Sequence, residues 1–364
     1  MRTGTATIPL HHGRAPRWLF NRMSLLARSI ITAMVVEFGT AETLKRLSDP
    51  FWFQCLGCTL GFDWHSSGIT TTVTGAIKEG LKEIDRELGL FVAGGKGKAS
   101  RKTLEEIVRI GEQEGIEADS LIYASRMSAK VDNSAVQDGF QLYHHTIFFD
   151  RAGHWSVVQQ GMNTSKRLAR RYHWHSQALK SFVEEPHTAV CSDLKTTGLN
   201  LVHRESSDTR SLLPELMKRA PEKNLKDLKS ILKTETLFMP RRHLIIPSDI
   251  KPERIYRILL KTYETDFNGF EGLLGLQGIG AKTIRALSLI AELIYGVKPS
   301  YEDPARYSYT VGGKDGTPYP VDRRTYDSVI EIMRKAVEKS PLQRSDKLKA
   351  LKRLYTHSQG LFRT

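Results

Sequence analysis

Residues 270–287 constrain the fold of this chain more than any other segment. They read Phe-Glu-Gly-Leu-Leu-Gly-Leu-Gln-Gly-Ile-Gly-Ala-Lys-Thr-Ile-Arg-Ala-Leu, so two short runs of helical spacing flank the pentapeptide Leu276–Gly280. Glycines at 278 and 280 allow the dihedral angles of a tight turn and leave no Cβ beside the backbone. The segment therefore predicts a short helix, a hairpin and a second helix.

Such a hairpin presents main-chain amides and a helix N-terminus to an anion. It is suited to hold one backbone phosphate of a nucleic acid without reading the base sequence. The alternative is a tight turn between two helices that is buried in a core. For the first interpretation the expected DNA-binding residues are Gly278, Ile279, Gly280, Lys282, Thr283 and Arg285.

The charge balance agrees with an anionic partner. The chain of 364 residues carries 54 Lys and Arg against 40 Asp and Glu, a formal net charge of +14. Such an excess favours nucleic acid as the partner, and we expect duplex DNA. Three cysteines are too few for a disulfide scaffold, and no apolar run is long enough to span a membrane or to form a signal peptide. We therefore expect a soluble cytoplasmic protein associated with the nucleoid; its oligomeric state stays open.

The C-terminal part resembles the helix-hairpin-helix DNA glycosylases of the endonuclease III type. Lys282 stands two residues after Gly280, where the bifunctional members have their lysine nucleophile. Val321-Asp322 precedes Arg323–Ile330, as the essential aspartate of that family precedes its helix. The resemblance implies that Lys282 and Asp322 are catalytic. The chain departs from the family because these two residues are 40 positions apart, which is a longer spacing than usual. It also has fewer helices before the hairpin and lacks the four cysteines of an iron–sulfur cluster.

The implied chemistry needs a neutral amine and a carboxylate. The amine of Lys282 would attack the sugar C1′ of a damaged nucleotide, expel the base and form a Schiff base, and β-elimination would then cut the strand. The positive end of the helix dipole disfavours an ammonium group in the first turn, and Asp322 would accept the proton. The simpler alternatives are a phosphate-contacting role for Lys282 and a helix N-cap role for Asp322.

The N-terminal part has a different pattern. Residues 142–157 flank the turn sequence Asp150-Arg151-Ala152-Gly153 and predict a β-hairpin or a small antiparallel sheet. We expect a loop in the aromatic stretch 51–68 and at the basic glycines 94–98, and a helix that starts near Ser165. Beyond about Ser207 the chain reads as helical. The predicted fold is thus a mixed α+β domain, 1–204, followed by an all-α helix-hairpin-helix domain, 205–364.

The whole chain also resembles a prokaryotic, chiefly archaeal, family labelled only as a domain of unknown function, number 763. The matching stretches are Leu10–Leu19, Phe62–Thr72, Val157–Asn163 and Ala169–His175. This resemblance implies no activity.

Polar and aromatic residues of the N-terminal part suggest a pocket for a base that has left the helical stack. The alternative is an aromatic core with hydrogen-bonded histidines. The candidates for the base pocket are Trp64, His65, Gln159, Gln160, Asn163 and Arg171.

We expect no cofactor, although two metal sites are alternatives. Cys55 and Cys58 have the spacing of zinc ligands, which His173, His175 or Cys191 would complete. Asp63 and His65 suit a metal-dependent nuclease. The glycines at 94–98 lack the spacing of a nucleotide-binding P-loop. The sequence thus predicts a base-excision DNA glycosylase with abasic-site lyase activity; the alternatives are a metal-dependent nuclease anchored by the hairpin and a non-enzymatic DNA-binding protein.

Overall fold

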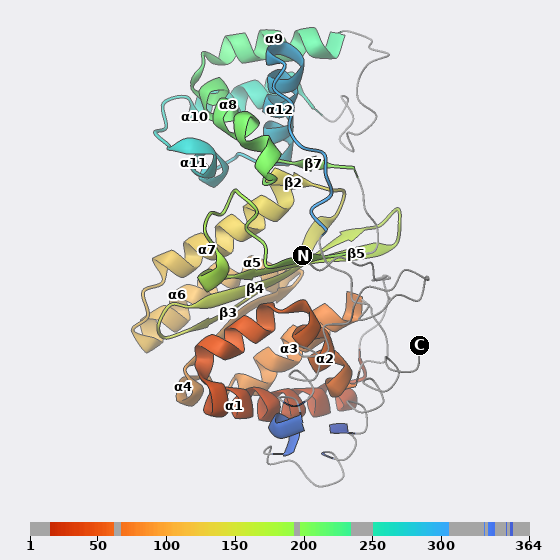
Figure 1. Cartoon of the computed structure of the whole chain (residues 1–364). Helices are drawn as coiled ribbons and strands as arrows, with labels where there is room; N and C mark the ends of the chain where they lie inside the picture. The colour runs from red at the N-terminus through yellow and green to blue at the C-terminus, as the bar shows by residue number, and fades with distance from the viewer. Residues whose placement is uncertain are drawn as a thin grey trace.

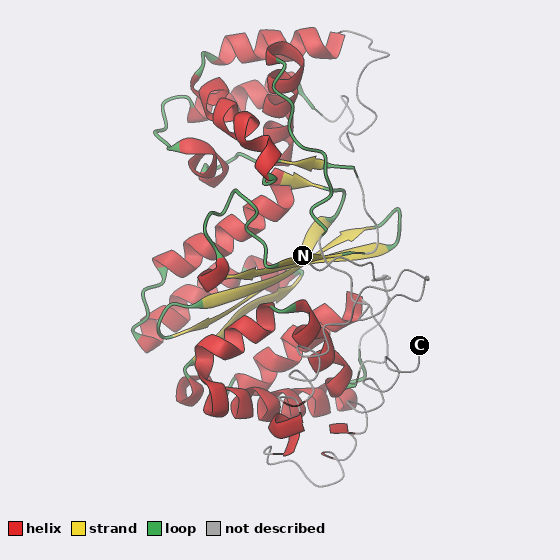
Figure 2. Cartoon of the chain, viewed as in Figure 1, coloured by secondary structure: helices red, strands yellow, loops and turns green. Residues whose placement is uncertain are grey.

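A computed structural model describes residues 15–61, 67–192, 197–233 and 250–305, together with 331, 334–338, 347, 350 and 351. Figures 1 and 2 show a sheet between two layers of helices, with a further group of helices beyond one of these layers. The five strands pair antiparallel in the order β1-β3-β4-β5-β6. They are β1 Leu90–Lys96, β3 Gln141–Asp150, β4 Trp155–Asn163, β5 Leu168–His175 and β6 Ala189–Cys191.

The sheet is buried on both faces, so its strands are apolar at consecutive positions. Leu90 and Val92 pack with Phe148 in one hydrophobic cluster, whereas Phe91 and Phe149 belong to a second cluster on the opposite face. The first cluster contains α1 Arg17–Ser48, α2 Pro50–Leu60 and α3 Ser67–Leu81, followed by the short α4 Asp85–Leu88. Alternation of side chains along each strand therefore divides the core between two helical layers.

The opposite face carries α5 Lys98–Arg101, α6 Thr103–Glu114 and α7 Asp119–Lys130. A single turn of π-helix, Val131–Ala135, continues α7 and leads into β2 Val136–Gln137, which pairs with β7 Leu199–Asn200. From here the second cluster runs without interruption into α8 Ser207–Lys218, α9 Pro221–Lys233, α10 Pro252–Thr262, α11 Gly269–Gly275 and α12 Ala281–Tyr295. Among the described residues between 207 and 299 the secondary structure is helical, as the sequence pattern predicts. The boundary near residue 205 stays a prediction, since the hydrophobic cluster crosses it.

The predicted β-hairpin is present, because β3 and β4 flank Asp150–Gly153. Helix α1 is broken at Gly39, which has φ 81° and ψ 170°. α1 is long and apolar enough to cross a membrane by length and composition alone. Its central residues Ile30, Ile31 and Met34 are fully buried in the protein core, which is why we interpret it as a core helix.

Three local predictions are wrong. Most of the aromatic stretch forms α2, because Asp49 caps the helix by accepting the amides of Phe51 and Trp52, and the protein core surrounds this helix on all sides. Gly94, Gly95 and Lys96 belong to the edge strand β1, where a Cβ on Gly94 would lie 2.3 Å from the carbonyl oxygen of His145; Gly97 is a turn before α5. The segment after Ser165 forms β5, since pairing with β4 outweighs its local helical preference.

Candidate nucleic-acid interface

The glycine hairpin joins α11 to α12 at the surface. Gly278 has φ 90°, a left-handed conformation that glycine adopts without strain, and Gly280 is extended and precedes the first residue of α12. A Cβ built at either glycine would meet no atom within 4 Å. Both positions therefore face open space, and a ligand can approach the backbone there.

The amides of this hairpin are available to such a ligand. Among the described residues, the amides of Gly278, Gly280 and Ala281 donate no hydrogen bond, whereas those of Thr283 and Ile284 donate to the carbonyl of Gly280. Unbonded amides at a helix N-terminus carry a partial positive charge. The arrangement is thus suited to an anion.

The side chains of the predicted DNA-binding residues point in two directions. Lys282 is exposed beside the open amides. Ile279, Thr283 and Arg285 are only 2%, 2% and 1% exposed, respectively, and pack inside the helical region. Burial lowers the pKa of Arg285 to about 10, against the opposing effect of Tyr301 and Glu292. Arg285 is therefore a core residue in this structure, and Ile279 anchors the hairpin rather than contacting a ligand.

Helix α7 of the N-terminal part holds the hairpin in place. The Lys130 ammonium donates to the carbonyl oxygens of Ile279 and Leu276, and the amide of Gln137 donates to the carbonyl of Ala281 at 2.9 Å. Because these bonds use carbonyl groups only, they fix the hairpin and leave its amides free. Sequence reasoning missed Lys130, because the carbonyl groups that it binds lie almost 150 residues further along the chain.

A cavity of about 250 Å³ lies along the same helix. Arg126 lines it one helical turn before Lys130, together with Ser125 and Gln159. The other lining residues are Ser100, Arg101, Thr103, Leu104, Ala129, Leu142, Tyr143, His144 and His145. Arg126 at the cavity and Lys130 at the hairpin thus lie one helical turn apart on α7.

A buried chain of hydrogen bonds begins at this cavity. Ser125 Oγ lies 2.8 Å from His145 Nε2, and His145 Nδ1 lies 2.8 Å from Gln159 Oε1. The Gln159 amide donates to Asp132 at 2.6 Å, which in turn accepts from Trp174 and is paired with His187. Because Gln159 Oε1 can only accept, His145 carries its proton on Nδ1 and accepts the Ser125 hydroxyl at Nε2. The Ser125 O–H bond is thus polarised toward His145, and its oxygen belongs to a residue that lines the cavity.

Burial keeps the two neighbouring histidines neutral. It lowers the pKa of His145 to about 4, although the bond to Gln159 acts in the opposite direction. It lowers the pKa of His144 to about 3, and His145 and Lys96 add to that effect. A neutral imidazole at 145 can accept the hydrogen bond from the Ser125 hydroxyl, while burial disfavours full transfer of the proton.

The remaining candidates for the base pocket are used inside the protein. Gln160 is fully buried and is hydrogen-bonded to Thr70, Tyr143 and the carbonyl of Ser67. Asn163 accepts from Ser165 and from the amide of Lys166 in a turn. Arg171 stacks 4.7 Å from the centre of the Phe53 ring and donates to His173. Of the described candidates, Gln159 lines the cavity; Trp64, His65, Asp63 and Asp322 lie outside the described residues.

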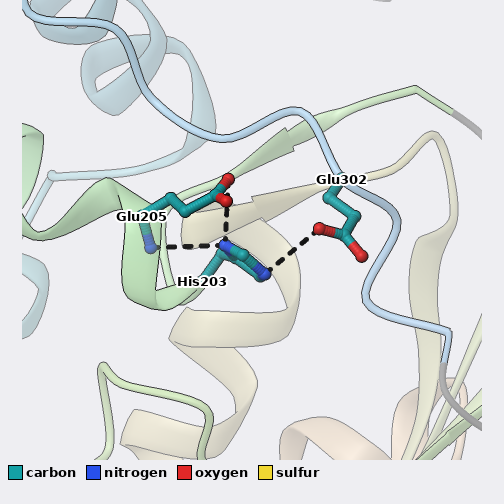
Figure 3. A group of neighbouring side chains, drawn as sticks. All are labelled: His203, Glu205 and Glu302. Atoms are coloured by element: carbon teal, nitrogen blue, oxygen red, sulfur yellow. Dashed lines mark hydrogen bonds and ion pairs between the residues drawn. The ribbon is translucent and has the colours of Figure 1, made fainter.

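The described side chains that could bind a metal ion together differ from those that the sequence suggested. Cys55 and Cys58 are buried on α2, and burial raises the pKa of the Cys55 thiol. In the part of the chain that the structure describes, the side chains that converge are instead His203, Glu205 and Glu302, with ligand atoms within 4.8 Å of one another (Figure 3). Because Glu302 lies nearly 100 residues after His203, no local sequence motif indicated this group.

Comparison with known proteins gives a family without an activity. No curated protein and no solved structure matches the chain significantly. A family model described as "Protein of unknown function (DUF763)" matches residues 4–321. Since this match spans most of the 364 residues, the chain belongs to the DUF763 family.

Proposed function

We propose that this protein binds duplex DNA through a helix-hairpin-helix formed by α11, the glycine hairpin and α12. The observation that carries the proposal is the set of amides at Gly278, Gly280 and Ala281 that donate no hydrogen bond within the described chain, beside the exposed Lys282. Such a set binds a phosphate group in preference to a base. The net charge of +14 supports a polyanionic partner, and the proposed location is the cytoplasmic nucleoid.

We further propose that the bound DNA is a substrate for base excision. In this proposal the hairpin holds the backbone, and the cavity beside Arg126 receives a nucleotide that has left the stack, with Gln159 and the polarised Ser125 hydroxyl at its wall. Lys282 attacks C1′ and Asp322 accepts the proton, as the resemblance to the endonuclease III type implies. The helix-hairpin-helix domain would then be the catalytic and anchoring part of one site.

The binding step is tested by fluorescence anisotropy with a labelled 20-base-pair duplex. Gly280→Ala keeps an allowed backbone conformation but places a methyl group before the open amides, and Lys282→Gln removes the neighbouring charge. We expect each to weaken binding about tenfold, and Lys282→Gln to reduce the slope of log affinity against log salt by about 0.9. Lys226→Gln on α9 makes the same charge change on another exposed helix position and should bind like the wild type. Equal affinity of all four proteins would refute binding at the hairpin.

The catalytic step is tested by borohydride trapping. The full chain is incubated with duplexes that contain an abasic site or a damaged base, with and without EDTA. A covalent protein–DNA adduct that survives EDTA and disappears in Lys282→Gln is expected. Strand cleavage that EDTA abolishes would assign the chain to the metal-dependent nucleases instead, and tight binding with no turnover would leave it a DNA-binding protein.

A further inference from the structure

A second cavity, of about 230 Å³, lies between the N-terminal sheet and the segment that follows α12. Its acidic lining residues are Glu185, Glu205, Glu302 and Asp303, and its basic ones are Arg204 and the histidines 187 and 203. In a chain with a net charge of +14, a cavity with four carboxylate side chains is an exception that favours a cation. The anion-binding role proposed for the hairpin does not account for it.

Segments distant in the sequence build this cavity. The amide of Asn200 donates to the carbonyl of Ser300, and the amide of Ser300 donates to the hydroxyl of Ser206. These bonds place Glu302 beside the short helical turn Arg204–Ser206. Arg170 is fully buried next to them and pairs with both Asp138 and Asp303, at 2.6 and 2.8 Å. The walls of the cavity are therefore fixed by main-chain bonds and a buried ion pair.

His203 lies between two carboxylates at the centre of this group. Its Nε2 is 3.3 Å from a carboxylate oxygen of Glu302, and its Nδ1 is 3.6 Å from one of Glu205 (Figure 3). The two glutamates approach opposite nitrogens of the ring, so one ion cannot bind all three side chains through their nearest atoms. The separation of Nε2 and Glu302 is long for a hydrogen bond. It agrees with two ligands of one ion, which at about 2.1 Å each lie about 3.0–3.4 Å apart.

An additional ligand atom lies in the same cavity. Asn200 is 2% exposed and lines the cavity, and its side-chain amide donates to the main-chain carbonyl of Glu302 at 2.9 Å. Its carbonyl oxygen, Oδ1, is buried and has no hydrogen-bond partner among the described residues. Burial of a carbonyl oxygen without a partner is unfavourable, and amide oxygens are ligands that divalent cations accept.

We propose that His203, Glu302 and Asn200 form a binding site for a divalent transition-metal ion such as Zn²⁺ or Mn²⁺. The ion is bound by His203 Nε2, a Glu302 carboxylate oxygen and Asn200 Oδ1, and water completes the coordination. Without the ion, Nδ1 accepts the main-chain amide of Glu205 at 3.3 Å. Binding of the ion at Nε2 therefore requires the ring proton to move to Nδ1, where the Glu205 carboxylate, 3.6 Å away, replaces the amide as its partner. Glu205 is thus a positioning residue, in the carboxylate–histidine–metal arrangement common in metalloproteins.

The proposal is tested by calorimetric titration of the metal-free full chain with Mn²⁺ and with Zn²⁺, without DNA, so that the result is independent of the proposed function. We expect one ion per chain. Glu302→Gln should weaken binding at least tenfold, and Glu205→Gln about 10- to 100-fold. Both glutamate side chains are about two-thirds exposed, so these variants are expected to fold, which circular dichroism checks.

Two control variants distinguish metal binding at this site from metal binding at Cys55 and Cys58. Glu253→Gln removes an exposed carboxylate on α10 and should leave the affinity unchanged. The double variant Cys55→Ala, Cys58→Ala should also retain the Mn²⁺ site. Absence of stoichiometric binding by the wild type would overturn the proposal. Equal affinity of the wild type and Glu302→Gln would do the same.

Discussion

The glycine hairpin and the central sheet carry the same kinds of polar group in opposite surroundings. At the hairpin, the amides of Gly278, Gly280 and Ala281 and the exposed Lys282 side chain have no hydrogen-bond partner among the described residues. In the sheet, Gln159, Gln160 and Arg170 are fully buried and bonded to other side chains. Polar groups left open at a surface are suited to bind, whereas polar groups bonded to one another stabilise and specify the fold. The comparison predicts that substitutions in the sheet act on stability and those at the hairpin act on binding.

The largest effect is expected for Arg170→Met. The variant keeps most of the side-chain volume but leaves the buried carboxylates of Asp138 and Asp303 without their cation. We expect the free energy of unfolding, measured by urea denaturation, to fall by about 3–5 kcal/mol. Arg28→Met breaks a surface pair with Glu83 and should cost about 1 kcal/mol or less. Equal costs in the two variants would contradict the division between sheet and surface.

The second-largest effect is expected from lowering the pH, which should destabilise the sheet region. The folded-state pKa of His145 is depressed to about 4 from an ordinary 6.5, so the unfolded chain binds protons more readily. The stabilisation is therefore complete above about pH 6.5 and is lost as the pH falls toward 4, at up to about 1.4 kcal/mol per pH unit for this group. Urea denaturation midpoints measured between pH 7 and pH 4 check this loss of stability. The stability of the His145→Gln variant should depend less steeply on pH. An identical pH dependence in the variant would show that other groups are responsible.

A smaller effect is expected where the two regions meet. Lys130→Met removes the ammonium group that donates to the hairpin carbonyls of Ile279 and Leu276. We expect a loss of about 1.5–3 kcal/mol in the free energy of unfolding, because bonds from a charged donor are lost. DNA affinity should also decrease, as the hairpin loses its support. Faster hydrogen exchange at Ile279 and Thr283 would locate the change, and unchanged exchange there would argue against this role of Lys130.

The smallest effect on stability is expected for Lys282→Gln. Its side chain is exposed, and no hydrogen bond or ion pair joins it to the rest of the described chain. The change in the free energy of unfolding, obtained from thermal denaturation, should lie within about 0.5 kcal/mol. A large destabilisation would mean that Lys282 is a structural residue, which would weaken its proposed role toward DNA.

Local patterns in the sequence were sufficient where a few neighbouring residues decide the conformation. Gly278 and Gly280 predicted the turn between α11 and α12, and Asp150–Gly153 predicted the β3–β4 hairpin. In both cases a glycine in a turn, or an alternation of apolar residues beside it, determines the local conformation. The same patterns misplaced α2, β1 and β5, because partners distant in the sequence outweighed the local preferences of these segments.

By itself, then, the sequence determined the hairpin, its basic surroundings and the predominance of helices after residue 207. Only the tertiary structure decided which polar residues are open and which are enclosed. It buried Arg285, bonded Gln160 and Arg171 within the core, placed Lys130 under the hairpin, and brought Glu302 to His203. The physical reason is that solvation and long-range pairing depend on how distant segments pack, and neither is encoded in the spacing of neighbouring residues.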